Sequence, residues 1–81
     1  MENDIEATLL RKLHKMRCWG KHHICESNLP KGFPKHLYKK VMKVADDLRR
    51  RGLLAKHPTH HETQWHLNWD KKEEIEKIIR D

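Results

Sequence analysis

The segment that decides the fold is residues 34–57, which reads PKHLYKKVMKVADDLRRRGLLAKH. Its apolar residues recur at intervals of three and four and so share one face of a helix: Leu37, Val41, Val44, Ala45 and Leu48. Pro34 suits the first turn of a helix, and Gly52 suits the position just past its end. The segment therefore predicts a helix over about residues 35–51, followed by a different kind of element from Leu53 onward.

Upstream of this segment, the pattern predicts one further helix and two short elements. A helix over about residues 4–17 is indicated by apolar residues at helical spacing: Ile5, Leu9, Leu10, Leu13 and Met16. Asn3 and Glu6 have the spacing of a capping box, Gly20 is a natural stop, and Trp19 is expected to close over the end of the core. Residues 22–25 suit a brief strand and residues 26–29 one helical turn, since three residues prevent anything longer: Pro30, Gly32 and Pro34.

Downstream, the sequence predicts a hairpin over about residues 53–68 and then a last helix. Pro58 lies at the turn of the hairpin. In the second half of the hairpin, Thr63, Trp65 and Leu67 alternate with polar residues and therefore face one side of the strand. We expect Trp65 and Trp69 to pack in the core. Asn68 or Asp70 can cap the last helix, whose apolar face is formed by Ile75, Ile78 and Ile79.

These elements predict an α+β fold that is mostly α, with a three-helix core, a β-hairpin and a C-terminal helix. The chain of 81 residues is long enough for one core, so we expect a single domain over residues 1–81. The order of elements is that of a winged helix-turn-helix, in which the third helix enters the major groove of DNA and the hairpin, or wing, reaches the adjacent backbone.

The charge of the chain favours a polyanionic partner. Eighteen Lys and Arg stand against twelve Asp and Glu, and residues 11–61 hold fourteen of the basic residues but only three acidic ones. The acidic residues near the N-terminus do not suit a signal peptide, and no stretch approaches the roughly twenty apolar residues of a membrane span. We therefore expect a cytoplasmic protein with reduced thiols.

The expected nucleic-acid contacts centre on the basic helix. If its apolar face points inward, His36, Lys39, Lys40 and Lys43 adjoin one another on the outside, and Lys31 and Lys35 precede the helix where anions are favoured. The predicted DNA-binding residues are Lys31, Lys35, His36, Lys39, Lys40, Lys43, Arg50, Arg51, Lys56 and His60. Two other interpretations stay open: the lysines could simply solvate an exposed helix, and the arginines could stabilise the negative end of its dipole.

Metal binding and catalysis are the alternatives that the composition raises. Cys18, His22, His23 and Cys25 are four candidate zinc ligands, but their spacing is not that of a zinc module, so buried cysteines and surface histidines are the favoured interpretation. A zinc module usually pairs two close ligands with a second pair farther along the chain, and that second pair of ligands would have to come from His57, His60, His61 or His66. No phosphate loop, catalytic triad or nucleophile elbow occurs, so we expect no enzyme activity, no metal and no cofactor.

The sequence also resembles a family. The run from His23 to His36, together with residues 48–54 and 56–59, is similar to small archaeal winged helix-turn-helix proteins of largely unassigned function. Residues 48–54 resemble the end of the recognition helix and the start of the wing in winged-helix transcription regulators. The resemblance covers about residues 5–79 and implies the fold and a DNA-binding, transcription-regulator-like role for the helix that begins near Lys35. Where relatives often place Gly in the wing, this chain has His60-His61-Glu62.

Three functional hypotheses follow. The first is a winged-helix protein that binds duplex DNA, with a recognition helix over about residues 35–51 and a wing over about residues 53–68. The second is a protein-interaction module of a larger assembly, and a homodimer through the terminal helix would suit either role. RNA binding ranks last, because it needs exposed aromatic side chains for stacking.

Overall fold

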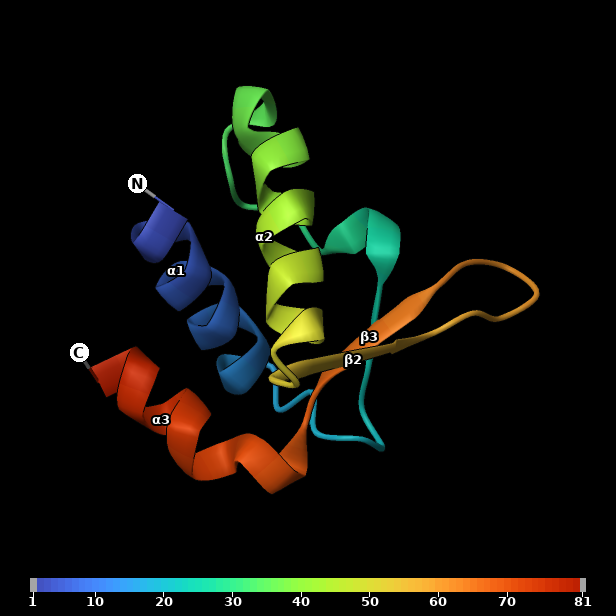
Figure 1. Ribbon diagram of the computed structural model, residues 1–81. Helices are drawn as coiled ribbons and strands as arrows, with labels where there is room; N and C mark the ends of the chain where they lie inside the picture. The colour runs from blue at the N-terminus through green and yellow to red at the C-terminus, as the bar shows by residue number, and fades with distance from the viewer. Residues whose placement is uncertain (1, 81) are drawn as a thin grey trace.

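The computed structural model describes residues 2–80 and is shown in Figure 1. Its α-helices are α1 (Glu2–Lys15), α2 (Tyr38–Arg50) and α3 (Lys72–Arg80). Three 3-10 turns accompany them: η1 (Glu26–Asn28), η2 (Lys35–Leu37) and η3 (Trp69–Lys71). The strands are β1 (Ile24–Cys25), β2 (Leu54–His57) and β3 (Gln64–Leu67). The fold is therefore α+β and mostly helical, as predicted, and none of the described helices has the length and apolar character needed to cross a membrane.

The three strands form one antiparallel sheet in the order β1-β3-β2. In the register, Trp65 of β3 lies between Ile24 of β1 and Lys56 of β2, and Gln64 lies between Cys25 and His57. Because side chains alternate along a strand, Trp65 and Leu67 point to one face, where both are buried, and Gln64 and His66 point to the other.

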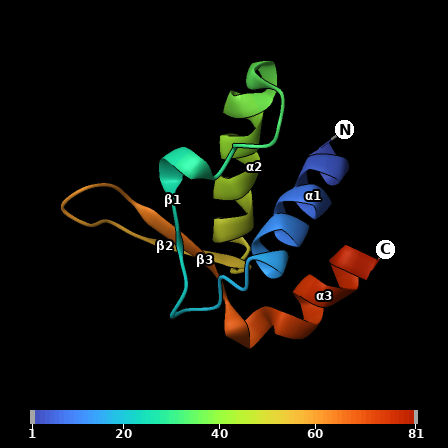
Figure 2. The same cartoon turned by 180° about the vertical axis from the view of Figure 1, so that it is seen from behind.

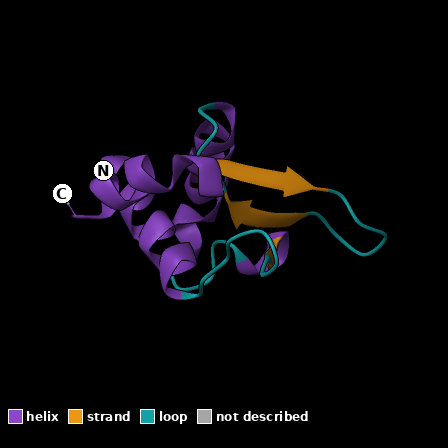
Figure 3. Cartoon of the chain, turned by 90° about the horizontal axis from the view of Figure 1, so that it is seen from below, coloured by secondary structure: helices purple, strands orange, loops and turns teal. Residues whose placement is uncertain are grey.

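The helices cover the buried face of the sheet. Helix α1 packs against α2 and α3, and the β2–β3 hairpin projects away from the helices while both chain ends lie on the opposite side (Figures 1 and 2). The view from below separates the hairpin from the helices (Figure 3). The largest fully buried side chains are Trp65, Leu9, Leu10, Leu13, Leu29, Leu48, Leu53, Leu67, Ile75 and Val41. The helical stripes read from the sequence thus supply most of the core.

Both long helices end in the same way, although only one ends at glycine. After α2, Gly52 adopts a φ of 82°, and the N–H of Leu53 donates to the carbonyl of Leu48. After α1, Arg17 adopts a φ of 55°, and the N–H of Cys18 donates to the carbonyl of Leu13. Helix α1 therefore stops before the predicted Arg17 and well before Gly20.

Two apolar residues that the sequence pattern predicted to be buried in the core are exposed. Met16 is 50% exposed because α1 ends at Lys15, so the residue lies beyond the helical stripe. Trp69 is 61% exposed because β3 ends at Leu67 and Asn68 begins η3, accepting a hydrogen bond from the N–H of Asp70. The strand alternation that buries Trp65 therefore does not extend to Trp69.

The start of the basic helix also differs from the prediction. Residues 35–37 form the 3-10 turn η2, and the α-helix begins at Tyr38 rather than at Lys35. Leu37, with φ −98° and ψ −3°, lies between the two helical geometries. Lys35 and His36 therefore precede α2 on a separate 3-10 turn, which has fewer residues per turn than an α-helix.

The loop of the hairpin is tied to η1 by one carboxylate. Glu62 accepts hydrogen bonds from the backbone N–H of Ser27 at 2.8 Å and from its hydroxyl at 3.2 Å. These bonds hold the pKa of Glu62 below its ordinary value of 4.5. Within the loop, the hydroxyl of Thr59 accepts from the N–H groups of His61 and Glu62. The loop is thus ordered by local bonds, by the bonds of Glu62 with Ser27, and by the hydrogen bond from the N–H of Glu26 in η1 to the carbonyl of Thr63 at 2.8 Å.

Acid should remove the contribution of Glu62 to stability. Its lowered folded-state pKa means that the contribution is present above the ordinary value of 4.5 and is lost as the pH falls through the lower, folded-state value. We expect Glu62→Gln to unfold at a lower urea concentration than the wild type at pH 7. The difference between the two proteins should vanish at pH values below the folded-state pKa of Glu62. Urea unfolding followed by circular dichroism at a series of pH values measures this. A difference that stays constant with pH would contradict it.

Candidate nucleic-acid interface

The outward face of α2 is cationic. Val41, Val44, Ala45 and Leu48 are buried, which turns Lys39 and Lys43 outward, where both are exposed. Lys40 lies at the edge of this face and is half-buried. The turn η2 adds Lys35 and His36, which are also exposed. Within the described residues, none of the lysines at positions 35, 39, 40 and 43 belongs to an ion pair.

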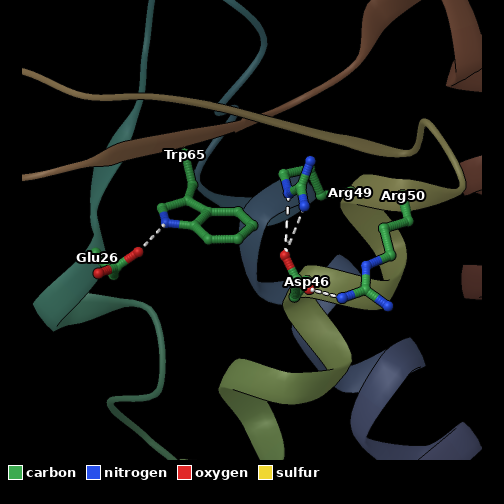
Figure 4. Close-up of polar contacts among 5 residues, drawn as sticks. All are labelled: Glu26, Asp46, Arg49, Arg50 and Trp65. Carbon is green, nitrogen blue, oxygen red and sulfur yellow. Dashed lines mark hydrogen bonds and ion pairs between the residues drawn. The ribbon is translucent and has the colours of Figure 1, made fainter.

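The arginines at the end of α2 are bound to carboxylates of the same chain, and Figure 4 shows the two that contact Asp46. Arg49 and Arg50 both contact Asp46, at 2.8 and 3.0 Å. Arg51 contacts Glu6 of α1 at 3.0 Å and Asp47 at 3.5 Å. The hydrogen bonds from Arg49 hold the pKa of Asp46 below its ordinary value of 3.8. Of the two predicted DNA contacts here, Arg50 keeps 72% of its side chain exposed, whereas Arg51 joins α2 to α1.

The remaining predicted contacts lie apart from α2. Lys56 of β2 places its ammonium 5.3 Å from the centre of the Trp65 ring, a cation–π contact on the hairpin. His60 is exposed in the hairpin loop, and Lys31 is exposed in the loop that follows η1. The predicted residues therefore divide among α2 with its flanking residues, the hairpin, and the loop after η1, which holds Lys31.

Between α2 and the hairpin lies η1 (Figure 1), and a groove with two carboxylates in its lining lies beside it. The groove has a volume of about 500 Å³ and is lined by Glu26, Ser27, Pro30, Tyr38, Lys39, Met42 and Glu62. Glu26 accepts a hydrogen bond from the indole N–H of Trp65 at 3.0 Å (Figure 4), and Glu62 accepts from Ser27. Sequence reasoning did not place these two carboxylates beside the basic helix, since the contact joins residues far apart in the chain.

The cysteines do not support the zinc set considered from the sequence. Cys18 is only 2% exposed, and burial raises the pKa of its thiol, which disfavours the thiolate that binds metal. Both cysteines are free, and within the described part of the chain no group of three or more His, Cys, Asp or Glu side chains is placed so that it could hold a metal ion.

The terminal helix uses its apolar face inside the molecule. Ile75 is fully buried, and Ile78 and Ile79 are partly buried against the core. The guanidinium of Arg11 donates to the carbonyl of Ile79 at 2.9 Å, which fastens the end of α3 to α1. Among the described residues, the large apolar side chains that stay exposed are Met16 and Trp69, and Trp69 packs edge-on against Trp19.

Comparison with protein-family models, with curated proteins and with solved structures gave no match for this chain.

Proposed function

We propose that this protein is a winged helix-turn-helix that binds duplex DNA, with α2 as the recognition helix and the β2–β3 hairpin as the wing. The order α1, β1, η1, α2, β2, β3, α3 fits this arrangement, with the second helix of the motif reduced to the single turn η1. The observation that carries the proposal is the exposed row of Lys35, His36, Lys39 and Lys43, whose lysines have no carboxylate partner within the described residues.

The charge distribution suggests how the DNA would be bound. A helix fits the major groove, so Lys39 and Lys43 would face base edges or phosphates, and Lys35 would face a phosphate near the start of the helix. Lys56 and His60 of the wing would reach the neighbouring backbone. Because lysines discriminate bases less well than arginine, asparagine or glutamine, we expect weak sequence preference and strong dependence on salt. A role in transcription regulation is part of this proposal.

Removal of two lysines from α2 should weaken DNA binding without unfolding the protein. We expect Lys39→Ala with Lys43→Ala to lower the affinity for a short random duplex roughly tenfold to a hundredfold at low salt. The slope of log affinity against log salt should fall by roughly 2, one for each lost phosphate contact. Fluorescence anisotropy over a salt series measures both, with the matched single strand for comparison.

The matched control is Lys71→Ala with Lys77→Ala, which removes the same charge from the exposed surface of η3 and α3. Charges beyond a Debye length of about 8–10 Å are largely screened, so this variant should keep most of the affinity. Equal losses in the two double variants would mean that only net charge matters and would contradict a contact through α2. Absence of duplex binding by the wild type at low salt would reject the proposal.

The main alternative is a protein-interaction module. The exposed Trp69, next to Trp19 and under the ammonium of Lys72 at 4.9 Å, favours a contact at this end of the molecule. The terminal helix itself gives less support, because Ile75 is already buried in the core. A homodimer would therefore use the surface around Trp69 rather than the apolar face of α3.

A further inference from the structure

The β2–β3 hairpin, which is the proposed wing, carries more histidines than permanently charged side chains. Residues 54–67 contain one lysine, Lys56, and one glutamate, Glu62, whose charges cancel. The formal charge of this segment is therefore zero when its imidazoles are neutral and +4 when all of them are protonated. The histidines are His57, His60, His61 and His66, and within the described residues none of them is paired with a carboxylate.

Three of these imidazoles are open to solvent. His57 ends β2, His60 and His61 lie in the hairpin loop, and all three are exposed. The loop projects away from the helices (Figure 1), and the N–H of His61 donates to the hydroxyl of Thr59, which holds the backbone at this point. The loop therefore presents its imidazoles on an ordered backbone.

Neighbouring imidazoles make protonation depend on a bound anion. The ring centres of His57 and His66 are 5.7 Å apart, and those of His57 and His23, which precedes β1, are 6.3 Å apart. Positive charges this close repel one another, so the free protein resists protonation of adjacent rings. A phosphate beside the rings favours their charged form and accepts their N–H groups. Protonation and phosphate binding should therefore promote each other.

The carboxylates that face the wing are already bound by other groups. Glu62 is bound by Ser27, Glu26 of η1 by the indole of Trp65, and Asp46 of α2, which faces Lys56, by Arg49 and Arg50. The bonds from Ser27 hold the pKa of Glu62 below its ordinary value of 4.5, so this carboxylate stays ionised and keeps the loop tied to Ser27 in mild acid. From β1, the titratable group beside Gln64 is the thiol of Cys25.

We propose that the wing binds phosphates of duplex DNA through protonated His57, His60 and His61. This contact rests on the proposed function and adds a pH dependence to it. A neutral imidazole donates from one nitrogen, whereas a protonated imidazole donates from both and attracts the phosphate charge. Because histidine is the side chain that changes charge between pH 5 and 8, the wing should bind weakly at pH 7.5 and firmly at pH 5.5. The lysines of α2 keep their charge throughout this range.

The experiment measures affinity for a short random duplex by fluorescence anisotropy, over a salt series at pH 5.5 and at pH 7.5. We expect the wild type to bind roughly tenfold or more tightly at pH 5.5. The slope of log affinity against log salt should also be steeper there by roughly 1 to 3, about one for each histidine that contacts a phosphate. His57→Gln with His60→Gln and His61→Gln keeps polar side chains but removes these protons, so it should lose most of both differences. Circular dichroism at each pH checks that the variant is folded.

Three further variants locate the pH dependence. Lys39→Ala with Lys43→Ala should bind more weakly at both pH values and keep the ratio between them. His22→Gln is the matched control, since it removes an exposed imidazole outside the hairpin, and it should keep the wild-type ratio. His36→Gln removes the imidazole beside α2 and should lower the ratio by less than the wing variant does. A larger effect of His36→Gln than of the wing variant would overturn the proposal by assigning the proton to η2.

The outcomes separate this contact from the proposed function. Equal duplex affinity of the wild type at the two pH values would overturn the wing contact and leave DNA binding through α2 in place. A wing variant that keeps the full wild-type ratio would also overturn it. Absence of duplex binding at both pH values, even at low salt, would reject the contact together with the proposed function.

Discussion

Trp65→Ala should unfold at a much lower urea concentration than the wild type. Trp65 is 1% exposed in the central strand of the sheet, and truncation of such a side chain in a core costs about 3–5 kcal/mol. A domain of this size has about 5–15 kcal/mol of stability in total. The variant also loses the hydrogen bond that the indole N–H donates to Glu26. Urea unfolding followed by far-ultraviolet circular dichroism measures the change.

Trp65→Phe separates the two contributions of the indole. Phenylalanine keeps an aromatic ring in the core but cannot donate to Glu26, so we expect a loss of about 1–3 kcal/mol. The order of stability should be wild type, then Trp65→Phe, then Trp65→Ala. A stability loss below about 1 kcal/mol in Trp65→Ala would show that the residue does not carry the contact between sheet and helices.

Lys12→Met should destabilise the loop that follows η1 by about 2–4 kcal/mol. The ammonium of Lys12 donates to three carbonyls, those of Asn28 at 2.7 Å, Leu29 at 2.9 Å and Lys31 at 2.7 Å. Three donated bonds require the charged form, even though burial lowers the pKa of Lys12. Methionine fills similar space but leaves all three acceptors without this donor. Urea unfolding gives the global change.

Trypsin offers a local measurement of the same variant. The bond after Lys31 lies in the loop that Lys12 holds, so Lys12→Met should be cut there faster than the wild type while α2 stays intact. Lys12→Arg is the matched control, because it keeps the charge and several donors, although its planar group fits three converging carbonyls less well. We expect it to lie between the other two. Equal cleavage rates in wild type and Lys12→Met would contradict the role of Lys12.

The strongly periodic parts of the chain could be predicted, because their burial pattern is local. The stripe from Val41 to Leu48 does form the buried face of α2, and Trp65 and Leu67 do alternate inward in β3. The ends of elements depended on bonds that periodicity does not encode. The Asn68 cap starts η3 directly after β3, so Trp69 is not on the strand and is exposed. Helix α1 ends next to Arg17, which adopts a left-handed conformation, and not at Gly20 as expected.

Contacts in the candidate sites could be predicted only where the spacing of two residues along one helix brings their side chains together. The four-residue separations of Asp46 from Arg50 and of Asp47 from Arg51 could have indicated ion pairs within the helix, which limit the predicted role of these arginines. The pairing of Arg51 with Glu6, and the approach of His23 to His57, follow from how distant segments pack. A strand of only two residues, β1, gives no sequence signal strong enough to set that register.

The strand order β1-β3-β2 leaves an open edge on each side of the sheet, and an open edge can pair with a strand of another molecule. β1 offers only two residues for such pairing. β2 is longer, but Lys56 places a charge on this edge strand. Pro58 follows the last residue of β2 and has no backbone N–H, so it cannot donate a further hydrogen bond to a neighbouring strand. A lysine proposed to approach phosphates therefore also discourages edge-to-edge aggregation.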